Sequence, residues 1–302
     1  MFREEYVRQT ELMLRCIPAV AEQDCFALKG GSAINFFVRD MPRLSVDIDL
    51  TYRRLADRDT SLSEIGQGLQ SIADLVTETI AGAVVTPRVV QGRVIRLVVT
   101  AGGTQIKIEP NLVLRGSVVD PVEMEICNTA RERFDLFVSV HCLSACDLYG
   151  GKLCAALDRQ HPRDLFDVKL LLDDTGITAE IRRAFVVYLA SHNRPMEELL
   201  APRLQNIRTS YEGEFHGMAG LDVSADELES VQASLAQTLQ NTLDNEERQF
   251  LLSMKSGDPD WNVLGIEHLE EMPALQWKLL NIRKMDTRKR DEQLDMLRKL
   301  LG

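Results

Sequence analysis

The sequence predicts a bilobal α+β fold, with a mixed sheet flanked by helices in residues 1–140 and an all-helical lobe in residues 141–302. Short apolar runs with strand alternation concentrate before residue 141, and helical periodicity separates them. Beyond that point nearly every segment repeats apolar residues at spacings of three and four. A chain of 302 residues is long enough for two such lobes.

In the first lobe, helices are expected over residues 4–23, 33–38 and 62–82, and Pro18 should kink or split the first of them. The expected strands are 25–28, 46–52, 88–91, 93–100, 104–110 and the apolar run 134–140. Ala101-Gly102-Gly103 predicts a hairpin turn between two of these strands.

In the second lobe, Ser144 and Asp147 have the spacing of a helix-capping box, so a helix should run from Ala145 to about Arg159. The next helix is expected to start at Pro162 and to end near residue 176. The remaining chain is helix-patterned, with loops around residues 195, 213–220, 257–259 and 273.

The net charge is −11, from 35 basic and 46 acidic residues, which argues against nucleic-acid binding over the whole surface. Residues 278–302 hold eight basic and four acidic residues, a local balance of +4 that leaves −15 for the rest. This basic end predicts either a solvated, salt-bridged helix or a local contact with nucleic acid.

Membrane insertion and export are not expected from this sequence. No apolar run approaches the roughly 20 residues of a membrane-spanning helix, and residues 1–10 are charged and lack the apolar core of a signal peptide. The six cysteines are too sparse for a disulfide scaffold, so free thiols in a reducing cytoplasm are expected.

The first group of residues that could carry chemistry is Lys29-Gly30-Gly31-Ser32 followed by Asp47-x-Asp49. Alternate residues of a strand share a face, so the two carboxylates should project together and attract a cation such as Mg²⁺. A glycine-rich turn at a helix start offers backbone N–H groups to phosphate. Each half alone is typical of an ordinary turn or a solvated strand edge, but the ordered pair predicts nucleoside-triphosphate chemistry.

Two further groups could complete such a site. Lys107 and Glu109 share one strand face; they are either an exposed ion pair or a third carboxylate facing the two aspartates, with a cation for phosphate. Lys152 and Arg159 share one helix face. Arg163, Asp164 and Asp167 follow on the next helix, where they form either salt bridges at the junction or part of a triphosphate site.

In this order the motifs resemble the DNA-polymerase-β-type nucleotidyltransferase superfamily, and within it the AbiEii/AbiGii-type toxins of type IV toxin–antitoxin and phage abortive-infection systems. Leu28–Ser32 with Ser45–Leu50 looks like the first motif, and Ile106–Glu109 resembles the second. Gly151-Lys152-Leu153 with Arg159, and Arg163-Asp164 with Asp167, resemble the third and fourth. The segment 273–278 is also similar, although it is less diagnostic.

The resemblance implies a nucleotidyltransferase lobe over residues 1–140 and a helical lobe over 141–302 that carries the Lys/Arg–Asp motifs. It implies Mg²⁺-dependent transfer of a nucleotide from a nucleoside triphosphate, with tRNA as a possible acceptor, and an antitoxin partner that acts as a repressor. By motif position, Asp47 and Asp49 would hold the metal. The other catalytic residues would be Glu109, Lys152 and Asp167. Nucleotide binding would fall to Lys29, Gly30, Gly31, Ser32, Lys107, Arg159, Arg163 and Asp164.

Two other activities fit the same residues. A nucleotide-binding regulatory module would keep the phosphate turn without performing any transfer. A kinase-like enzyme would direct attack to the γ-phosphate instead of the α-phosphate.

Overall fold

A computed structural model describes residues 2–302, and it confirms the predicted α+β class. The described chain divides into two compact units. The first comprises residues 1–148 together with Glu214–Asp222, and the second comprises Tyr149–Gly213 and Val223–Gly302. None of the helices described here is long and apolar enough to cross a membrane.

The described part of the first unit is built on one mixed seven-stranded sheet of order β3-β4-β5-β2-β1-β7-β6. Its strands are β1 (Phe26–Lys29), β2 (Ile48–Tyr52), β3 (Val84–Val90), β4 (Arg93–Ala101), β5 (Thr104–Asn111), β6 (Val122–Glu125) and β7 (Ser139–Cys142). The pairs β1–β7 and β2–β5 are parallel and the other neighbours are antiparallel. The helical segments are α1 (Glu4–Ala21), α2 (Gly30–Ala33), the π-helix η1 (Ile34–Val38), α3 (Arg58–Thr79) and α4 (Asn128–Phe134).

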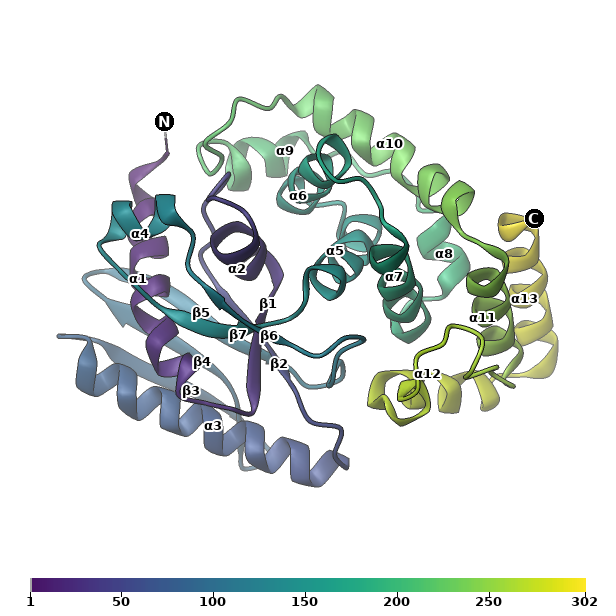
Figure 1. Ribbon diagram of the computed structural model, residues 1–302, viewed down its shortest axis with the longest axis horizontal. Coiled ribbons are helices and arrows are strands. Elements are labelled where there is room, and N and C mark those ends of the chain that lie inside the picture. The colour runs from purple at the N-terminus through teal and green to yellow at the C-terminus, as the bar shows by residue number, and fades with distance from the viewer. Residues whose placement is uncertain (1) are drawn as a thin grey trace. The chain divides into compact units, whose positions relative to one another are not determined.

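The two faces of the central strands differ in character because side chains alternate along each strand. Ile48 of β2, Ile106 and Ile108 of β5 and Leu97 of β4 are almost fully buried and form the core. Helix α1 packs on β5 and β7, and α3 packs on β4 and β3 (Figure 1). On the other side, Asp49 of β2, Lys107 and Glu109 of β5 and Arg96 of β4 alternate with this apolar set, so these strands carry a group of charges there.

Several sequence-based predictions for this unit need correction. Helix α1 is not split at Pro18, because only the last turn loses a hydrogen bond there and Glu22 N still bonds to the Pro18 carbonyl at 3.3 Å. The run 134–140 is not one strand. Phe134 ends α4 and Asp135 adopts a left-handed conformation with φ of 48°. The strand begins only at Ser139; β6 and α4 were not predicted.

The second unit is helical, as predicted, and the division between the units falls within α5. Its helices are α5 (Ala145–Arg159), α6 (Pro162–Asp173), α7 (Ala179–Ser191), α8 (Met196–Leu200), α9 (Arg208–Ser210), the π-helix η2 (Tyr211–Phe215), α10 (Ala225–Thr242), α11 (Asn245–Ser256), the 3₁₀ helix η3 (Leu269–Glu271), α12 (Pro273–Arg283) and α13 (Thr287–Leu301). The predicted cap of α5 is confirmed, because the Ser144 hydroxyl donates to Asp147 Oδ2 at 2.9 Å and accepts from Asp147 N at 3.3 Å.

The segment Glu214–Asp222 belongs to the first unit although it lies far along the chain. Leu44 N donates to the Met218 carbonyl at 2.9 Å, and Gly220 N donates to the Pro42 carbonyl at 2.8 Å. These bonds hold the stretch that leads from η1 into β2. The sequence-based boundary at residue 140 had assigned this segment to the helical lobe.

Candidate active site

The glycine-rich turn joins β1 directly to α2 and leaves no room for side chains. Gly30 has a φ of +71°, which strongly favours glycine. A Cβ on Gly30 would also lie 2.5 Å from Asp49 Oδ2, and a Cβ on Gly31 would lie 2.6 Å from Arg43 Nη2. Any side chain at either position would therefore displace a charged side chain, and at Gly30 it would also strain the backbone.

Ser32 connects this turn to the strand that carries the aspartates. Its hydroxyl is buried, donates to the Asp47 carbonyl at 2.5 Å and lies 3.0 Å from Ser45 Oγ. In the described structure the Ser32 side chain therefore fixes the backbone of Asp47. Its contact with phosphate stays a prediction.

The two aspartates and the Lys107–Glu109 pair are brought together on the charged face of the sheet. Asp49 is the register partner of Lys29 in β1 and of Glu109 in β5. Asp47 Oδ1 accepts a hydrogen bond from Lys107 N at 3.3 Å. Glu109 thus lies beside the Asp-x-Asp strand, where the sequence pattern predicted it.

Glu109 is held by an arginine that the sequence analysis did not single out. Arg96 Nη1 of β4 lies 2.7 Å from Glu109 Oε1, with 27% of the Arg96 side chain and 37% of the Glu109 side chain exposed. Together with the register partners this makes a row of charges across four neighbouring strands: Lys29, Asp49, Glu109 and Arg96. The two adjacent carboxylates are therefore flanked by one cation on each side.

Arg43 was also missed. It lies in the stretch between Ser32 and Asp47, it is only 2% exposed, and its Nη1 donates to the Leu44 carbonyl at 2.8 Å. Because its guanidinium packs against Gly31, it places a positive charge beside the glycine turn. Its only sequence signal was its position among the 14 residues between Ser32 and Asp47.

The motif residues of the second unit form a buried ionic cluster at the junction of α5 and α6. Lys152 Nζ lies 2.9 Å from Asp164 Oδ1 and 3.0 Å from Asp167 Oδ2, and all three side chains are at most 6% exposed. Arg159, whose side chain is 62% exposed, also pairs with Asp164 at 2.8 Å. Lys152 and Arg159 thus share one helix face, as predicted.

Arg163 does not join this cluster, although its spacing suggested a pair with Asp167. Asp167 pairs with Lys152 instead, and Arg163 makes no ion pair with any residue that the structure describes. Arg163 N donates to His161 Nδ1 at 3.1 Å, so His161 caps the start of α6. The sharp turn between the helices is made by Gln160, which has a φ of 51°.

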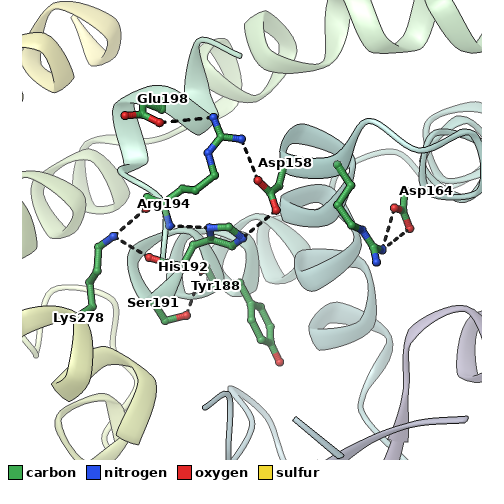
Figure 2. A network of polar contacts seen from close by, with 9 residues as sticks. Asp158, Asp164, Tyr188, Ser191, His192, Arg194, Glu198 and Lys278 are labelled. Carbon is green, nitrogen blue, oxygen red and sulfur yellow. Dashed lines mark hydrogen bonds and ion pairs between the residues drawn. The ribbon is translucent and has the colours of Figure 1, made fainter. Parts of the chain in front are cut away.

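The segment 273–278 ends in Lys278, which lies in a separate polar network shown in Figure 2. Lys278 Nζ donates to the carbonyls of His192 and Arg194, at 2.6 and 2.7 Å. Burial lowers the pKa of Lys278 to about 8, and the charge of Lys255 adds to this shift. His192 and Arg194 both contact Asp158, which ties α5 to the end of α7.

The cysteines and histidines of the described chain form no candidate metal site. All six thiols are free, and burial raises the pKa of Cys16 and of Cys142 to about 12. Residues 2–302 contain no group of three or more histidine, cysteine, aspartate or glutamate side chains placed to hold a metal ion. Asp47 and Asp49, with Glu109 beside them, are the oxygen donors that the charged face offers.

Comparison with known proteins bears on the family and the fold of the chain. A family model described as "Nucleotidyl transferase AbiEii toxin, Type IV TA system" matches residues 11–281. The fold is similar to that of MenT4, a nucleotidyltransferase toxin from Mycobacterium tuberculosis H37Rv, with a TM-score of 0.59 and 15% sequence identity. That match covers 99% of this chain and 92% of the MenT4 chain. No curated protein matches the chain at a significant level.

Proposed function

The chain belongs to the AbiEii family of nucleotidyltransferase toxins of type IV toxin–antitoxin systems, and from that premise we propose that it uses Mg²⁺ to transfer a nucleotide to an RNA acceptor. Family membership implies a nucleoside triphosphate as substrate and an antitoxin as partner. The observation that supports the proposal best is the placement of Asp47, Asp49 and Glu109 on one sheet face, with Asp49 packed against Gly30.

The donor set fits a magnesium ion. Mg²⁺ takes hard oxygen ligands, and it commonly uses one or two protein carboxylates together with water and substrate phosphates. Asp47 and Asp49 supply two such carboxylates on one strand, and the Asp49 oxygen lies in the space that a side chain at residue 30 would fill. When bound, the ion would neutralise charge on the triphosphate and polarise the reacting phosphate.

In the proposed reaction an acceptor hydroxyl forms a bond to the α-phosphorus, and the bond to the β-phosphate oxygen breaks to release pyrophosphate. Gly30 and Gly31 expose backbone to the phosphates, while Lys29, Lys107 and Arg43 supply positive charge around them. Ser32 positions Asp47. Glu109, beside the two aspartates, accepts the proton of the hydroxyl, and Arg96 orients its carboxylate.

For the second unit, the family motifs support a role in the same reaction. Arg159 is the exposed cation of the buried cluster and is suited to contact phosphate. Lys152 and Asp164 hold its position through their shared ion pairs, and Asp167 anchors Lys152. Arg163 has no ion-pair partner among the described residues and provides a second guanidinium.

Incubation of the protein with total RNA and each labelled triphosphate separates the possible activities. Transfer of an α-phosphate label to RNA, with pyrophosphate release that requires Mg²⁺ and is lost in Asp49→Ala, is expected. Transfer of a γ-phosphate label alone would identify a kinase, and triphosphate binding without transfer would identify a regulatory module. Fractionating the labelled RNA tests whether tRNA is the acceptor.

We further propose that the enzyme acts in the cytoplasm and that its activity limits phage growth. Expression without the antitoxin should slow bacterial growth, and Asp49→Ala should relieve the inhibition. Equal inhibition by both proteins would remove catalysis as its cause. Phage yield in cells carrying the intact toxin–antitoxin pair, compared with the Asp49→Ala pair, tests the defence role.

A further inference from the structure

Arg115 is a buried cation whose guanidinium is incompletely hydrogen-bonded. It follows β5, its side chain is 6% exposed, and it makes no ion pair with any residue in the described part of the chain. Its Nη1 has one long hydrogen bond, 3.4 Å, to the Asp57 carbonyl. Its Nε is buried and has no hydrogen-bond partner. A buried charge that lacks a partner is strongly unfavourable, so the site is incomplete as the protein alone builds it.

The charges around Arg115 have both signs, because Arg58 lowers its pKa while Tyr52 and Asp57 raise it. Burial is the larger cause of the lowered pKa of Arg115. Arg58, the exposed first residue of α3, lowers that pKa further. Asp57 is the closest carboxylate in that environment, but it is already committed to the cap of α3. Its Oδ1 accepts from Asp59 N and Thr60 N, and its Oδ2 accepts from the Thr60 hydroxyl.

The backbone around Arg115 prevents the side chain from escaping to solvent by a simple shift. Gly116 N donates to the Tyr52 carbonyl at 2.8 Å, and Arg115 N donates to the Val113 carbonyl at 3.1 Å. Gly116 has a φ of +78°, and a Cβ there would lie 2.5 Å from Leu55 Cδ2. The guanidinium is therefore held beside the loop that joins β2 to α3.

We propose that Arg115 and Arg58 form a binding site for a phosphate group at this place in the first unit. Guanidinium groups recognise phosphate through paired charge-assisted hydrogen bonds, and a dianion would balance both cations. The site follows the C-terminal end of β2, whereas Asp47 and Asp49 lie at its N-terminal end, so it is distinct from the proposed metal site. The phosphate comes either from free inorganic phosphate or from the backbone of an RNA.

Thermal unfolding in phosphate tests the site without any measurement of transfer. Replacing chloride by millimolar inorganic phosphate at constant ionic strength and pH should raise the Tm of the wild-type protein by about 2–4 °C. Arg115→Met should lose this rise, and without phosphate it should melt at or above the wild-type temperature, because an unpaired charge is replaced by an apolar side chain of similar size. Arg88→Met, which changes an exposed arginine of β3, is the matched control and should keep the rise.

A second variant keeps the proposal open to refutation if Arg115→Met does not fold. Arg58→Glu changes only an exposed side chain, and it should abolish the phosphate-dependent rise. No rise in the wild-type protein, or an equal rise in either site variant, would overturn the proposal whether or not the chain transfers nucleotides.

The affinity for a single-stranded oligoribonucleotide, measured at several salt concentrations, shows whether the phosphate group comes from RNA. If RNA supplies the group, Arg115→Met should reduce the slope of log affinity against log salt by about one. If free phosphate is the ligand, that slope should be the same in both proteins while the Tm rise is still lost in the variant. Both outcomes uphold a phosphate site at Arg115.

Discussion

The carboxylate of Asp49 occupies the space that any side chain at Gly30 would need, since a Cβ there would lie 2.5 Å from Asp49 Oδ2. The glycine turn and the Asp-x-Asp strand are therefore one structural unit, although 18 residues separate the two positions in the sequence. The backbone of Gly30, with a φ of +71°, adds a second reason why only glycine fits.

Replacement of this glycine should displace the metal-binding carboxylate. Gly30→Ala is expected to lower the transfer rate on the order of 10²-fold, because shifts near 1 Å in reacting groups have effects of that size. Gly82→Ala is the matched control: its φ is +72°, yet nothing lies within 4 Å of the added Cβ. Both variants should lose about 1–2 kcal/mol of unfolding free energy from backbone strain. Steady-state transfer assays and denaturant unfolding measure the two effects.

The two glycines share a left-handed backbone, so the difference in activity between the variants reports what is specific to Gly30, namely its place in the glycine turn and its contact with Asp49. Full activity in Gly30→Ala would show that the position of the Asp49 carboxylate does not matter for transfer. Loss of activity in Gly82→Ala as well would assign the effect to backbone strain in general.

The Arg96–Glu109 pair predicts two changes of opposite sign in magnesium affinity. Arg96→Met leaves Glu109 unpaired beside Asp49, which makes the sheet face more negative, so Mg²⁺ should bind several-fold more tightly. Glu109→Gln leaves Arg96 unpaired beside Asp49, so Mg²⁺ should bind several-fold more weakly. Calorimetric titration of the metal measures both. Shifts of the same sign in the two variants would contradict an electrostatic coupling of this pair to the metal site.

The sequence was sufficient to predict what depends on local pattern. Alternation over residues 46–52 and 104–110 identified β2 and β5, and the order of the Gly-Gly-Ser and Asp-x-Asp motifs identified the charged face. Glu109 was placed beside the aspartates because residues of one strand face can meet only those on the same face of a neighbouring strand.

Long-range partners could not be predicted in the same way. Nothing local to Arg96 or Arg43 shows that one pairs with Glu109 and the other packs against Gly31, because both contacts depend on how distant strands are ordered. Segment 214–222 contains two glycines within nine residues, so its sequence is typical of a loop and does not reveal that it bonds to residues 42–44. The burial of Lys152 depends on α6, which carries Asp164 and Asp167, and the sequence of α5 alone does not show how the two helices pack.

That burial changes what substitution of Lys152 should do. A lysine on an exposed helix face could be replaced by alanine with little change in melting temperature. In the structure the lysine is 6% exposed and pairs with Asp164 and Asp167. Its removal takes the paired cation from buried Asp167 and leaves Asp164 with Arg159 alone, so Lys152→Ala should lower the unfolding free energy by roughly 3–5 kcal/mol. Urea unfolding measures this loss.

Two control substitutions separate burial from charge. Lys169→Ala on α6 removes a lysine that pairs with Asp173 on the helix surface, and it should change stability by no more than about 0.5 kcal/mol. Adding Asp167→Asn to Lys152→Ala should recover part of the loss, because the charge left without its partner is removed. A Lys152→Ala variant as stable as the wild type would contradict the buried cluster.

The last prediction concerns Lys278, whose buried ammonium should make stability rise with pH. Its pKa is about 8 in the folded protein and 10.5 in the unfolded chain. Below about pH 8 both states are protonated and the full cost of burying the charge is present. Between pH 8 and 10.5 the unfolded state binds more protons, so the unfolding free energy contributed by this group increases, by roughly 3 kcal/mol in total. The neutral amine still has two N–H donors for the carbonyls of His192 and Arg194, so deprotonation breaks neither hydrogen bond.

Comparison with Lys278→Met isolates this contribution, because other titrating groups, among them Lys255, Glu197 and Glu198, are present in both proteins. The stability of the wild type relative to Lys278→Met should rise from pH 7.5 to pH 10. The same difference for Lys284→Met, an exposed lysine of the same region, should stay flat. Only a folded-state pKa below that of the unfolded chain makes this stability difference rise with pH. A difference that stays constant or falls over this range would therefore mean that the pKa of Lys278 is not lowered in the folded protein.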